Sequence, residues 1–318
     1  MARFTFFGGK GGVGKTTVSA AYGLRCANAG LKTLLVSTDP AHSTSDVFGQ
    51  QFGDDPQPVE GCDGLYAMEI DPEEEVEEHL MDVRRTMSEQ VSEVVVKEMD
   101  RQIELAHQTP GAHEAALFDR FIQVMRESDD YDRVVFDTSP TGGTLRLLAL
   151  PEFLGEWTDR LLEKRRESMR LYDMAAVGGK EPEKTAEDDP IIEHLRSRKE
   201  KFEFAARTLR EDAAFYLVLN PDELSVRETS RTIETLRSYD LSVTGLVMNK
   251  VTPSPEDHEE GRGASYLRNR VATERERIDY VRGEFDVPLV AVIESRTTEI
   301  TGDALEAVAA GLDVAVDD

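Results

Sequence analysis

A glycine-rich stretch early in the chain has the residue types and the spacing that hold a chain of phosphates. It follows the apolar segment Arg3–Phe7 and reads GGKGGVGKTT from Gly8 to Thr17. From Gly9 onward it fits the pattern G-x-x-x-x-G-K-[ST], whose glycines let backbone N–H groups point inward at phosphate oxygens. A helical repeat of apolar residues follows, and the start of a helix adds the positive end of its dipole. The pattern predicts phosphate contacts from Gly9, Gly11, Gly12, Val13, Gly14, Lys15, Thr16 and Thr17.

Three side chains predict the chemistry around these phosphates. In such a loop Lys15 reaches the β and γ phosphates of a nucleotide, and the hydroxyl of Thr16 binds Mg²⁺. Asp137 follows the apolar segment Arg133–Phe136. A carboxylate in that position usually binds Mg²⁺ through water. ATP and Mg²⁺ are therefore the predicted cofactors.

A second carboxylate, Asp39, follows the apolar segment Thr33–Ser37 and begins the run Asp39-Pro40-Ala41-His42-Ser43. Next to the phosphates, a carboxylate can hold and polarise a water in line with the γ-phosphorus. We therefore predict that Asp39 is catalytic, together with Lys15. The alternative, on spacing alone, is that Asp39 is an ordinary cap of the helix after the strand.

Lys10 is an additional lysine near the start of the same loop. The sequence Gly-Lys-Gly-Gly-Val-Gly-Lys-Thr resembles the deviant Walker A group of ATPases, which includes the nitrogenase iron protein, MinD-type partitioning ATPases and ArsA. In that group this lysine crosses the dimer interface to the partner's nucleotide. The resemblance therefore implies that Lys10 is a third catalytic residue, acting on the other subunit's site.

Further segments resemble the ArsA family, which also includes the guided-entry targeting ATPase for tail-anchored membrane proteins. Members of that family use an Asn and a Pro segment to hold adenine, which implies these roles for Asn249 and Pro288. Spacing alone leaves Asn249 as a turn residue. The resemblance covers nearly the whole chain, through the segments Asp39–Ser43, Asp137–Leu148, Leu150–Glu152, Pro221–Ser225, Asn249 and Val287–Leu289.

Three departures from the family pattern narrow what the resemblance implies. Gly143 stands where the family usually has a histidine in its switch loop. No CxxC lies between Val251 and Phe285, so the zinc that joins many targeting-branch dimers is not expected. No cysteine follows Cys62, whereas the pump branch binds arsenic or antimony through thiolates, the soft ligands that such metalloids need.

The apolar segments that precede these residues must be the strands that position them. They are short, rich in Val, Leu, Ile and Phe, and mostly separated by helical patterns, which predicts a doubly wound, mostly parallel α/β sheet. Ligands of such sheets lie at the carboxyl ends of the strands. The predicted strands are Arg3–Phe7, Thr33–Ser37, Arg133–Phe136, Phe215–Leu219, Gly245–Val251 and Val287–Ile293.

Two helical regions are too long to be simple crossovers, and we expect them to form a helical subdomain within a single ATPase domain that spans 1–318. The inserts cover about 72–125 and 151–210, and the first opens with the helix-start signal Asp71-Pro72-Glu73. Flexible methionines suit a promiscuous apolar groove, although apolar residues at helical spacing are equally typical of plain core. The methionines concerned are Met81, Met87, Met99, Met125, Met169 and Met174.

Composition excludes several classes of protein. A net charge of −26 over 318 residues argues against nucleic-acid binding, which needs clustered basic residues. The spread of acid and the 27 Arg against ten Lys suggest a proteome adapted to high salt. No apolar run approaches the length of a membrane span, no export signal precedes Phe4, and the two cysteines form no disulfide or CxxC pattern, so we expect a cytoplasmic protein.

These observations predict an ATP-hydrolysing homodimer, since one P-loop and no internal repeat leave the composite site to two subunits. The expected partners are a hydrophobic, tail-anchored client and a membrane receptor or pump subunit. One alternative is the energising ATPase of an arsenite or antimonite efflux pump. Another is a cargo-positioning ATPase of the partitioning type, although the acidic segment Ala304–Asp318 offers it no membrane-binding tail.

Overall fold

The fold is described by a computed structural model. It describes residues 2–38, 43–71, 73–75, 81, 112–137, 159–164, 167 and 190–314. The predicted Asp39, Gly143 and most of the two predicted inserts lie outside these ranges.

The described part of the chain forms an eight-stranded sheet in the order β3-β4-β2-β5-β1-β6-β7-β8. Every neighbouring pair is parallel except β3 with β4. The predicted doubly wound, mostly parallel sheet is therefore confirmed. The strands are β1 (Phe4–Gly9), β2 (Thr33–Ser37), β3 (Gln57–Pro58), β4 (Leu65–Glu69), β5 (Arg133–Asp137), β6 (Ala213–Leu219), β7 (Val243–Val251) and β8 (Leu289–Glu294).

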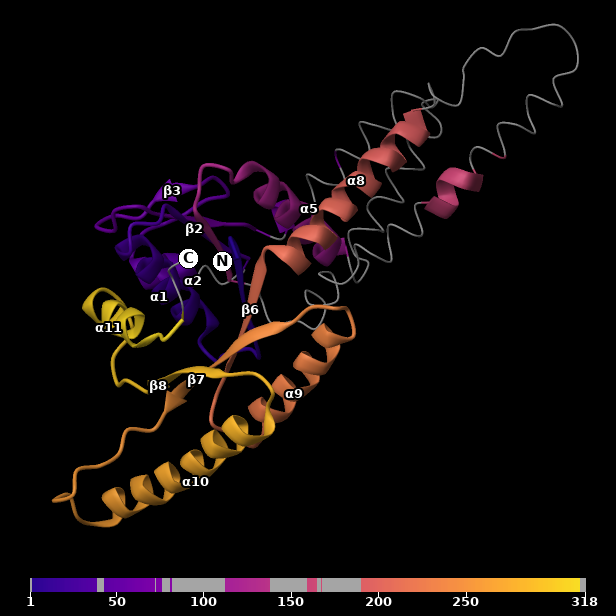
Figure 1. The fold of residues 1–318 in the computed structure, drawn as a ribbon. Coiled ribbons are helices and arrows are strands. Elements are labelled where there is room, and N and C mark those ends of the chain that lie inside the picture. Colours follow the sequence, from indigo (N-terminus) through magenta and orange to yellow (C-terminus); the bar gives the residue numbers. More distant parts are fainter. Residues whose placement is uncertain are drawn as a thin grey trace, which may run out of the picture.

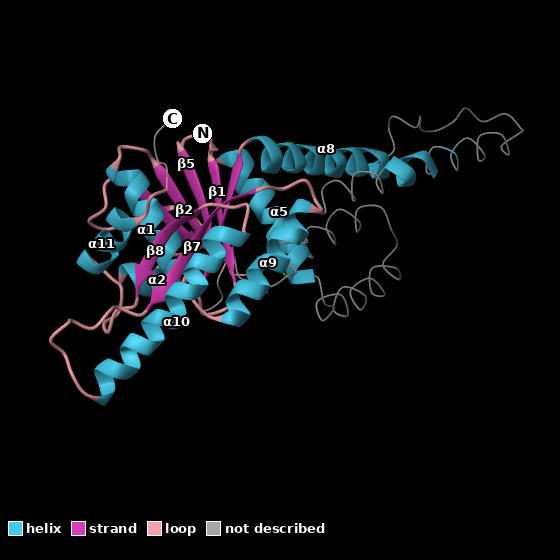
Figure 2. Ribbon diagram, turned by 60° about the horizontal axis from the view of Figure 1, so that its bottom comes forward, coloured by secondary structure: helices cyan, strands magenta, loops and turns pink. Residues whose placement is uncertain are grey.

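Helices cover both faces of this sheet (Figures 1 and 2). On one face, α1 and α11 pack over residues such as Phe7 and Val135. On the other face, α5 and α8 pack over Phe6 and Phe136, while α9 and α10 pack over Leu217 and Leu246. Within the described residues the helices include α1 (Lys15–Asn28), α2 (Ser43–Phe48), α5 (Ala112–Glu127), α8 (Pro190–Glu211), α9 (Glu223–Arg237), α10 (Arg262–Glu284) and α11 (Asp303–Gly311).

Stacked phenylalanine rings join the three central strands. The ring of Phe6 in β1 lies 4.6 Å from that of Phe136 in β5 and 5.1 Å from that of Phe215 in β6. Phe121 of α5 meets Phe136 edge to face at 5.2 Å. Because side chains alternate along a strand, Phe7 points to the opposite face and packs against Tyr22 of α1. These contacts fix β1 and β5 side by side, and the P-loop and Asp137 lie where those two strands end.

The described parts of the predicted inserts contribute to this core. Asp71 accepts a hydrogen bond from the backbone N–H of Glu73 at 2.8 Å, as its predicted capping role requires. Met125 in α5 is a core residue, only 2% exposed, whereas Met81 is 51% exposed. Met87, Met99, Met169 and Met174 lie outside the described residues.

Helix α8 is the part of the second insert that can be followed along its length. It begins at Pro190 and ends at Glu211, close to the predicted end of the insert at about 210. Its C-terminal half packs on the sheet through Phe202, Ala205 and Leu209. Its N-terminal half projects beyond the sheet (Figure 1). Among the described helices, none is both long enough and apolar enough to cross a membrane.

The stacked rings give a test of the central packing. We expect Phe6→Ala to lower the free energy of unfolding by about 3–5 kcal/mol, because it removes a buried ring between two others. Chemical denaturation at fixed salt measures the change. The exposed Leu224 is the control, since Leu224→Ala should change stability by no more than about 0.5 kcal/mol. Equal effects of the two substitutions would contradict the central role of the Phe6 ring.

Candidate functional site

The loop between β1 and α1 has the backbone shape of a phosphate cradle. Gly9, Gly12 and Gly14 have φ values of +144°, +77° and +89°, which L side chains rarely adopt. Gly14 caps α1 without a side-chain hydrogen bond, and the first turn of the helix contains no acidic residue. The first N–H groups of α1 therefore keep the donor capacity and partial positive charge that attract an anion.

Two of these glycines are also required by close packing. A Cβ on Gly9 would lie 2.2 Å from the carbonyl oxygen of Val218 in β6. A Cβ on Gly14 would lie 2.3 Å from Nδ2 of Asn249 in β7. A Cβ on Gly12 would meet nothing within 4 Å, so its positive φ alone favours glycine. The loop thus fits closely against the ends of β6 and β7.

The end of β7 holds two carbonyls of the loop. The buried amide of Asn249 donates from Nδ2 to the carbonyl of Val13 at 2.8 Å. Lys250, itself at a positive φ of 56°, donates from Nζ to the carbonyl of Gly12 at 2.7 Å. Because both carbonyls are turned toward β7, the loop is held in one conformation from outside. Lys250 was not singled out in the sequence, although it directly follows the predicted Asn249.

Lys15 is folded back over the loop. Its side chain is buried, and Nζ donates to the carbonyl of Lys10 at 3.4 Å, a long hydrogen bond. Thr17, which follows in α1, lines the adjacent cavity, while Gly11 is exposed in the loop. Of the predicted phosphate loop, the structure therefore places Gly12, Gly14, Lys15, Thr16 and Thr17 around one opening.

The carboxyl ends of β1, β2 and β5 meet beside this loop. Asp137 is aligned with Phe7 on one side and with Ser37 on the other, and its side chain is buried. The Oγ1 atom of Thr16 lies 3.4 Å from Oγ of Ser43 at the start of α2. Hydroxyl and carboxylate oxygens are the ligands that Mg²⁺ prefers, so these residue types fit the predicted metal.

Asp39 lies outside the described residues, but both of its flanks are fixed. Before it, the N–H of Thr38 donates to the carbonyl of Asp137 at 3.2 Å. After it, α2 is anchored by Glu69 at the end of β4, which accepts from N and Oγ of Ser45 at 2.9 and 2.8 Å. Glu69 was missed in the sequence. The signal available was a lone acid after the apolar run Leu65–Met68.

A cavity of about 750 Å³ opens beside these residues. This volume lies within the usual range of small-molecule sites, about 300–1,000 Å³. Its walls come from the phosphate loop and the first turn of α1, from α2, and from Asn249 and Lys250. The last residue of β8, Glu294, and the segment after it, which includes Arg296 and Ile300, complete the walls.

The structure does not bring Pro288 to this cavity. The carbonyl of Pro288 accepts from the N–H of Leu246, which places this proline at the amino end of β8. In a parallel sheet that end is opposite to the carboxyl ends where the phosphate loop lies. The residues of β8 and its following loop that line the cavity begin at Glu294. Pro288 thus lies at the amino end of the strand whose carboxyl end, at Glu294, lines the cavity.

Lys10 lies at the rim of the loop and contacts helix α9. Its Nζ atom is 3.7 Å from Oε2 of Glu228 in the same chain. The resemblance implied a contact across a dimer, and the single chain shows this contact within one subunit.

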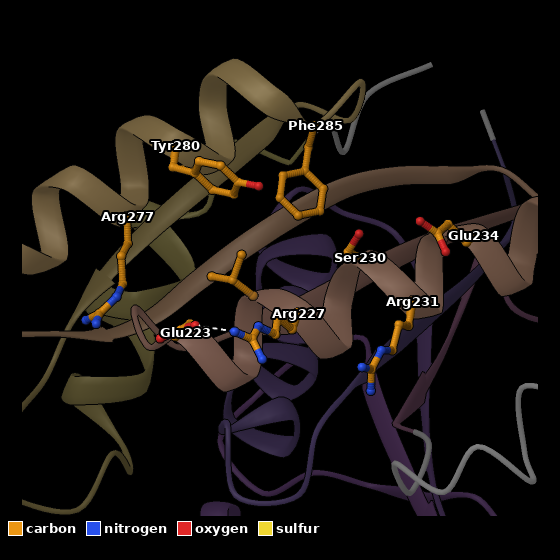
Figure 3. Close-up of a pocket in the computed structure, with 9 residues that line it drawn as sticks. Glu223, Arg227, Ser230, Arg231, Glu234, Arg277, Tyr280 and Phe285 are labelled. Carbon is orange, nitrogen blue, oxygen red and sulfur yellow. Dashed lines mark hydrogen bonds and ion pairs between the residues drawn. The ribbon is translucent and has the colours of Figure 1, made fainter.

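A second hollow, of about 620 Å³, lies between α9 and α10 (Figure 3). In the close-up, Tyr280 and Phe285 face each other at one end, and Arg227 points toward Glu223. Arg277 and Arg231 also line this hollow. It includes no residue of the phosphate loop.

A strand, a glycine loop and a helix that begins with Lys15 and Thr16, with Asp137 on the neighbouring strand, define a P-loop nucleoside triphosphatase. The chain matches the model of the anion-transporting ATPase family over residues 2–313 and belongs to that family. The protein is therefore an ATPase.

Known relatives cover most of the chain. The putative arsenical pump-driving ATPase 2 of Aquifex aeolicus is 31% identical over 293 residues, which are 91% of this chain and 92% of that protein. ATPase GET3A of Arabidopsis thaliana is 32% identical over 310 residues, 96% of this chain and 82% of that protein. ATPase GET3 of Lachancea thermotolerans is 33% identical over 269 residues, 81% of this chain and 74% of that protein.

The fit of Gly14 against Asn249 predicts a sharp effect on ATP binding. Gly14→Ala forces a Cβ onto the Asn249 amide at a left-handed φ, and such strain costs about 1–3 kcal/mol. We expect ATP affinity to fall by about tenfold or more, as measured by titration with a fluorescent ATP analogue. The control is Gly30→Ala, which has a similar φ of +91° but open space around it. It should lower stability and leave ATP affinity unchanged, whereas equal affinities of both variants would contradict the proposed fit.

Proposed function

We propose that this ATPase is a homodimeric, Mg²⁺-dependent switch that binds hydrophobic, tail-anchored membrane-protein segments and delivers them to a membrane receptor. The observation that supports it most directly is a complete phosphate loop with a second lysine, Lys10, half-exposed at its rim. The relatives named ATPase GET3A and ATPase GET3 support the same branch of the family. The cytoplasm is the proposed compartment.

In this proposal the described residues divide the work on ATP. The N–H groups of the loop and of the first turn of α1 bind the phosphates, and Lys15 leaves the carbonyl of Lys10 to reach the β and γ phosphates. Thr16 and Asp137 would hold Mg²⁺, which would neutralise charge that develops during phosphoryl transfer. Asn249 orients the loop through Val13. Asp39 positions the attacking water.

The placement of Lys10 is compatible with the proposed homodimer. Lys10 and Lys15 leave the same loop, and the side chain of Lys15 lies back over it, whereas the Nζ atom of Lys10 lies beside α9. A lysine at the rim can serve a nucleotide held by another subunit. Since the chain contains one P-loop, a second copy is the proposed source of that nucleotide.

The two thiols favour this proposal over an ATPase that drives a metalloid pump, the function that the name of the Aquifex relative suggests. Burial raises the pKa of Cys26, and burial together with Glu306 and Asp63 raises that of Cys62. The thiolate is the form that binds a soft ion, so both shifts disfavour binding. Both residues also belong to the sheet core around α1 and α11 rather than to a helical insert.

The packing of α11, near the end of the described chain, supports a cargo-positioning ATPase of the partitioning type less well than the proposed function. Leu305, Val308 and Leu312 of the α11 region are buried in the core beside α1. An amphipathic helix that binds a membrane surface needs its apolar face accessible. The apolar face of α11 is used for folding.

The proposed role of Asp39 predicts a change in rate without a change in binding. Asp39→Asn should preserve ATP affinity and slow hydrolysis by about two to four orders of magnitude, because the water loses its base. Lys15→Ala should abolish ATP binding. Phosphate release and ATP titration measure the two quantities. Turnover of Asp39→Asn at the unaltered rate would leave Asp39 as a helix cap.

A complementation experiment tests the trans role of Lys10. Lys10→Ala chains and Asp39→Asn chains should each be inactive, and a mixture should regain activity, because one composite site in each heterodimer is then intact. Differently tagged chains show whether heterodimers form. An inactive mixture that contains heterodimers would rule out the trans role.

Ligand-induced stabilisation distinguishes the candidate functions. A hydrophobic helical peptide at a hundredfold excess over its dissociation constant should stabilise the nucleotide-bound protein by about 2.7 kcal/mol, and arsenite should not. Hydrogen exchange should slow along Val76–Met99 and Phe153–Met174, which lie mostly outside the described residues. A polar peptide of equal length is the control. Stabilisation by arsenite alone would favour the pump ATPase, and none by either ligand would favour the cargo-positioning ATPase.

A further inference from the structure

Glu228 occupies a position that the fold fixes relative to the phosphate loop. It lies in the second turn of α9, which begins after β6, and β6 pairs with β1 as far as Gly9. The start of α9 is tied down, since Asp222 accepts from the N–H of Ser225 at 2.9 Å and Oγ of Ser225 accepts from the N–H of Asn220 at 3.0 Å. Helix α9 therefore holds Glu228 at a set distance from the end of β1.

The contact between Lys10 and Glu228 is of the kind that forms and breaks readily. The nitrogen and oxygen are 3.7 Å apart, and the side chains are 36% and 38% exposed. Ion pairs with such exposure are weak and sensitive to salt. By contrast, the carboxylate of Glu69 receives two short hydrogen bonds from Ser45 in a buried setting. The Lys10–Glu228 pair thus holds a charge in place without locking the fold.

We propose that Glu228 is a positioning residue for Lys10. Glu228 keeps the lysine beside the phosphate loop of the same chain until Lys10 binds the nucleotide held by the partner subunit. This inference rests on the proposed homodimer, in which Lys10 acts on the other subunit. In the separate chain, Glu228 neutralises the ammonium and aims it at α9. In the dimer, the phosphates offer several negative charges in place of one carboxylate, so Lys10 transfers to them. Release of Lys10 is therefore part of assembling each composite site.

Electrostatics set the size and the salt dependence of this restraint. A half-exposed ion pair shifts an equilibrium by about 1.4- to 5-fold. Formation of a homodimer releases two such lysines. The two ion pairs therefore lower the association constant of the dimer by about 2- to 30-fold at low salt. At about 1 M salt the screening length is about 3 Å, shorter than the ion pair, and the restraint should vanish. Dimerisation of this chain, whose net charge is −26, should therefore become tighter as salt rises.

The test compares nucleotide-dependent dimerisation of the full chain with and without the charge on Glu228. Analytical ultracentrifugation with Mg²⁺ and a non-hydrolysable ATP analogue gives the dimerisation constant, at about 0.15 M and about 1 M salt. We expect Glu228→Gln to dimerise about 2- to 30-fold more tightly than the unaltered chain at low salt and equally at high salt. Circular dichroism shows that the compared chains are folded at each salt.

Two further variants separate the explanations. Glu234→Gln removes an equal charge from α9 on a side chain that lines the hollow beside α10, and it should leave dimerisation unchanged. In a Lys10→Ala background, Glu228→Gln should have no effect, because its action passes through the lysine. If Glu228→Gln has no effect or weakens the dimer while Lys10→Ala also weakens it, this inference is overturned and the trans role of Lys10 stands. If Lys10→Ala leaves dimerisation and hydrolysis unaltered, the trans role itself fails.

Discussion

The hydrogen bond from Asn249 to the carbonyl of Val13 joins the phosphate loop to a strand that lies far away in sequence. It requires a glycine at position 14, because any Cβ there would occupy the place of the amide. It also requires that β6 and β7 be paired in register beside β1, so that the end of β7 reaches the loop. The loop is therefore shaped from outside by the sheet, and the sheet is held in turn by the aromatic stack around Phe6. A buried polar contact of this kind is costly to leave unmade, so the loop has one stable form.

The sheet could be predicted from the sequence where strands are buried on both faces. The run Thr33–Ser37 was bounded correctly because a fully buried parallel strand needs unbroken apolar residues. Strands β3 and β4 were missed, since β3 has two residues at the edge of the sheet and β4 mixes Tyr, Ala and Met and ends on the buried Glu69. Their stability comes from partners such as Ser45, which are distant in the sequence and cannot be identified from the residues of the strand itself.

In the candidate site, too, some residues could be predicted from the local sequence and others could not. The P-loop could be found because its functional residues are consecutive in the sequence, and Asn249 because it lies near the end of a clear strand. Pro288 and the cavity segment after Glu294 belong to one strand but to its opposite ends, and only the direction of pairing with Leu246 distinguishes them. The contact of Lys10 with Glu228 could not be predicted, because it depends on where α9 leaves the sheet. Residues that act through distant segments need the fold before their partners can be named.

The central position of β1 has a consequence for how the chain acquires its activity during synthesis. Phe4 is aligned with Val134 on one side and with Ala213 on the other. The first strand to be synthesised, β1, therefore cannot pair until β5 and β6 have been made. Asn249 emerges from the ribosome later still. A growing chain therefore exposes the glycine loop long before anything shapes it, and sheets built from such remote pairings form slowly. The chain would therefore bind nucleotide only once it is fully folded. ATP should stabilise the folded protein and leave the nascent chain unaffected.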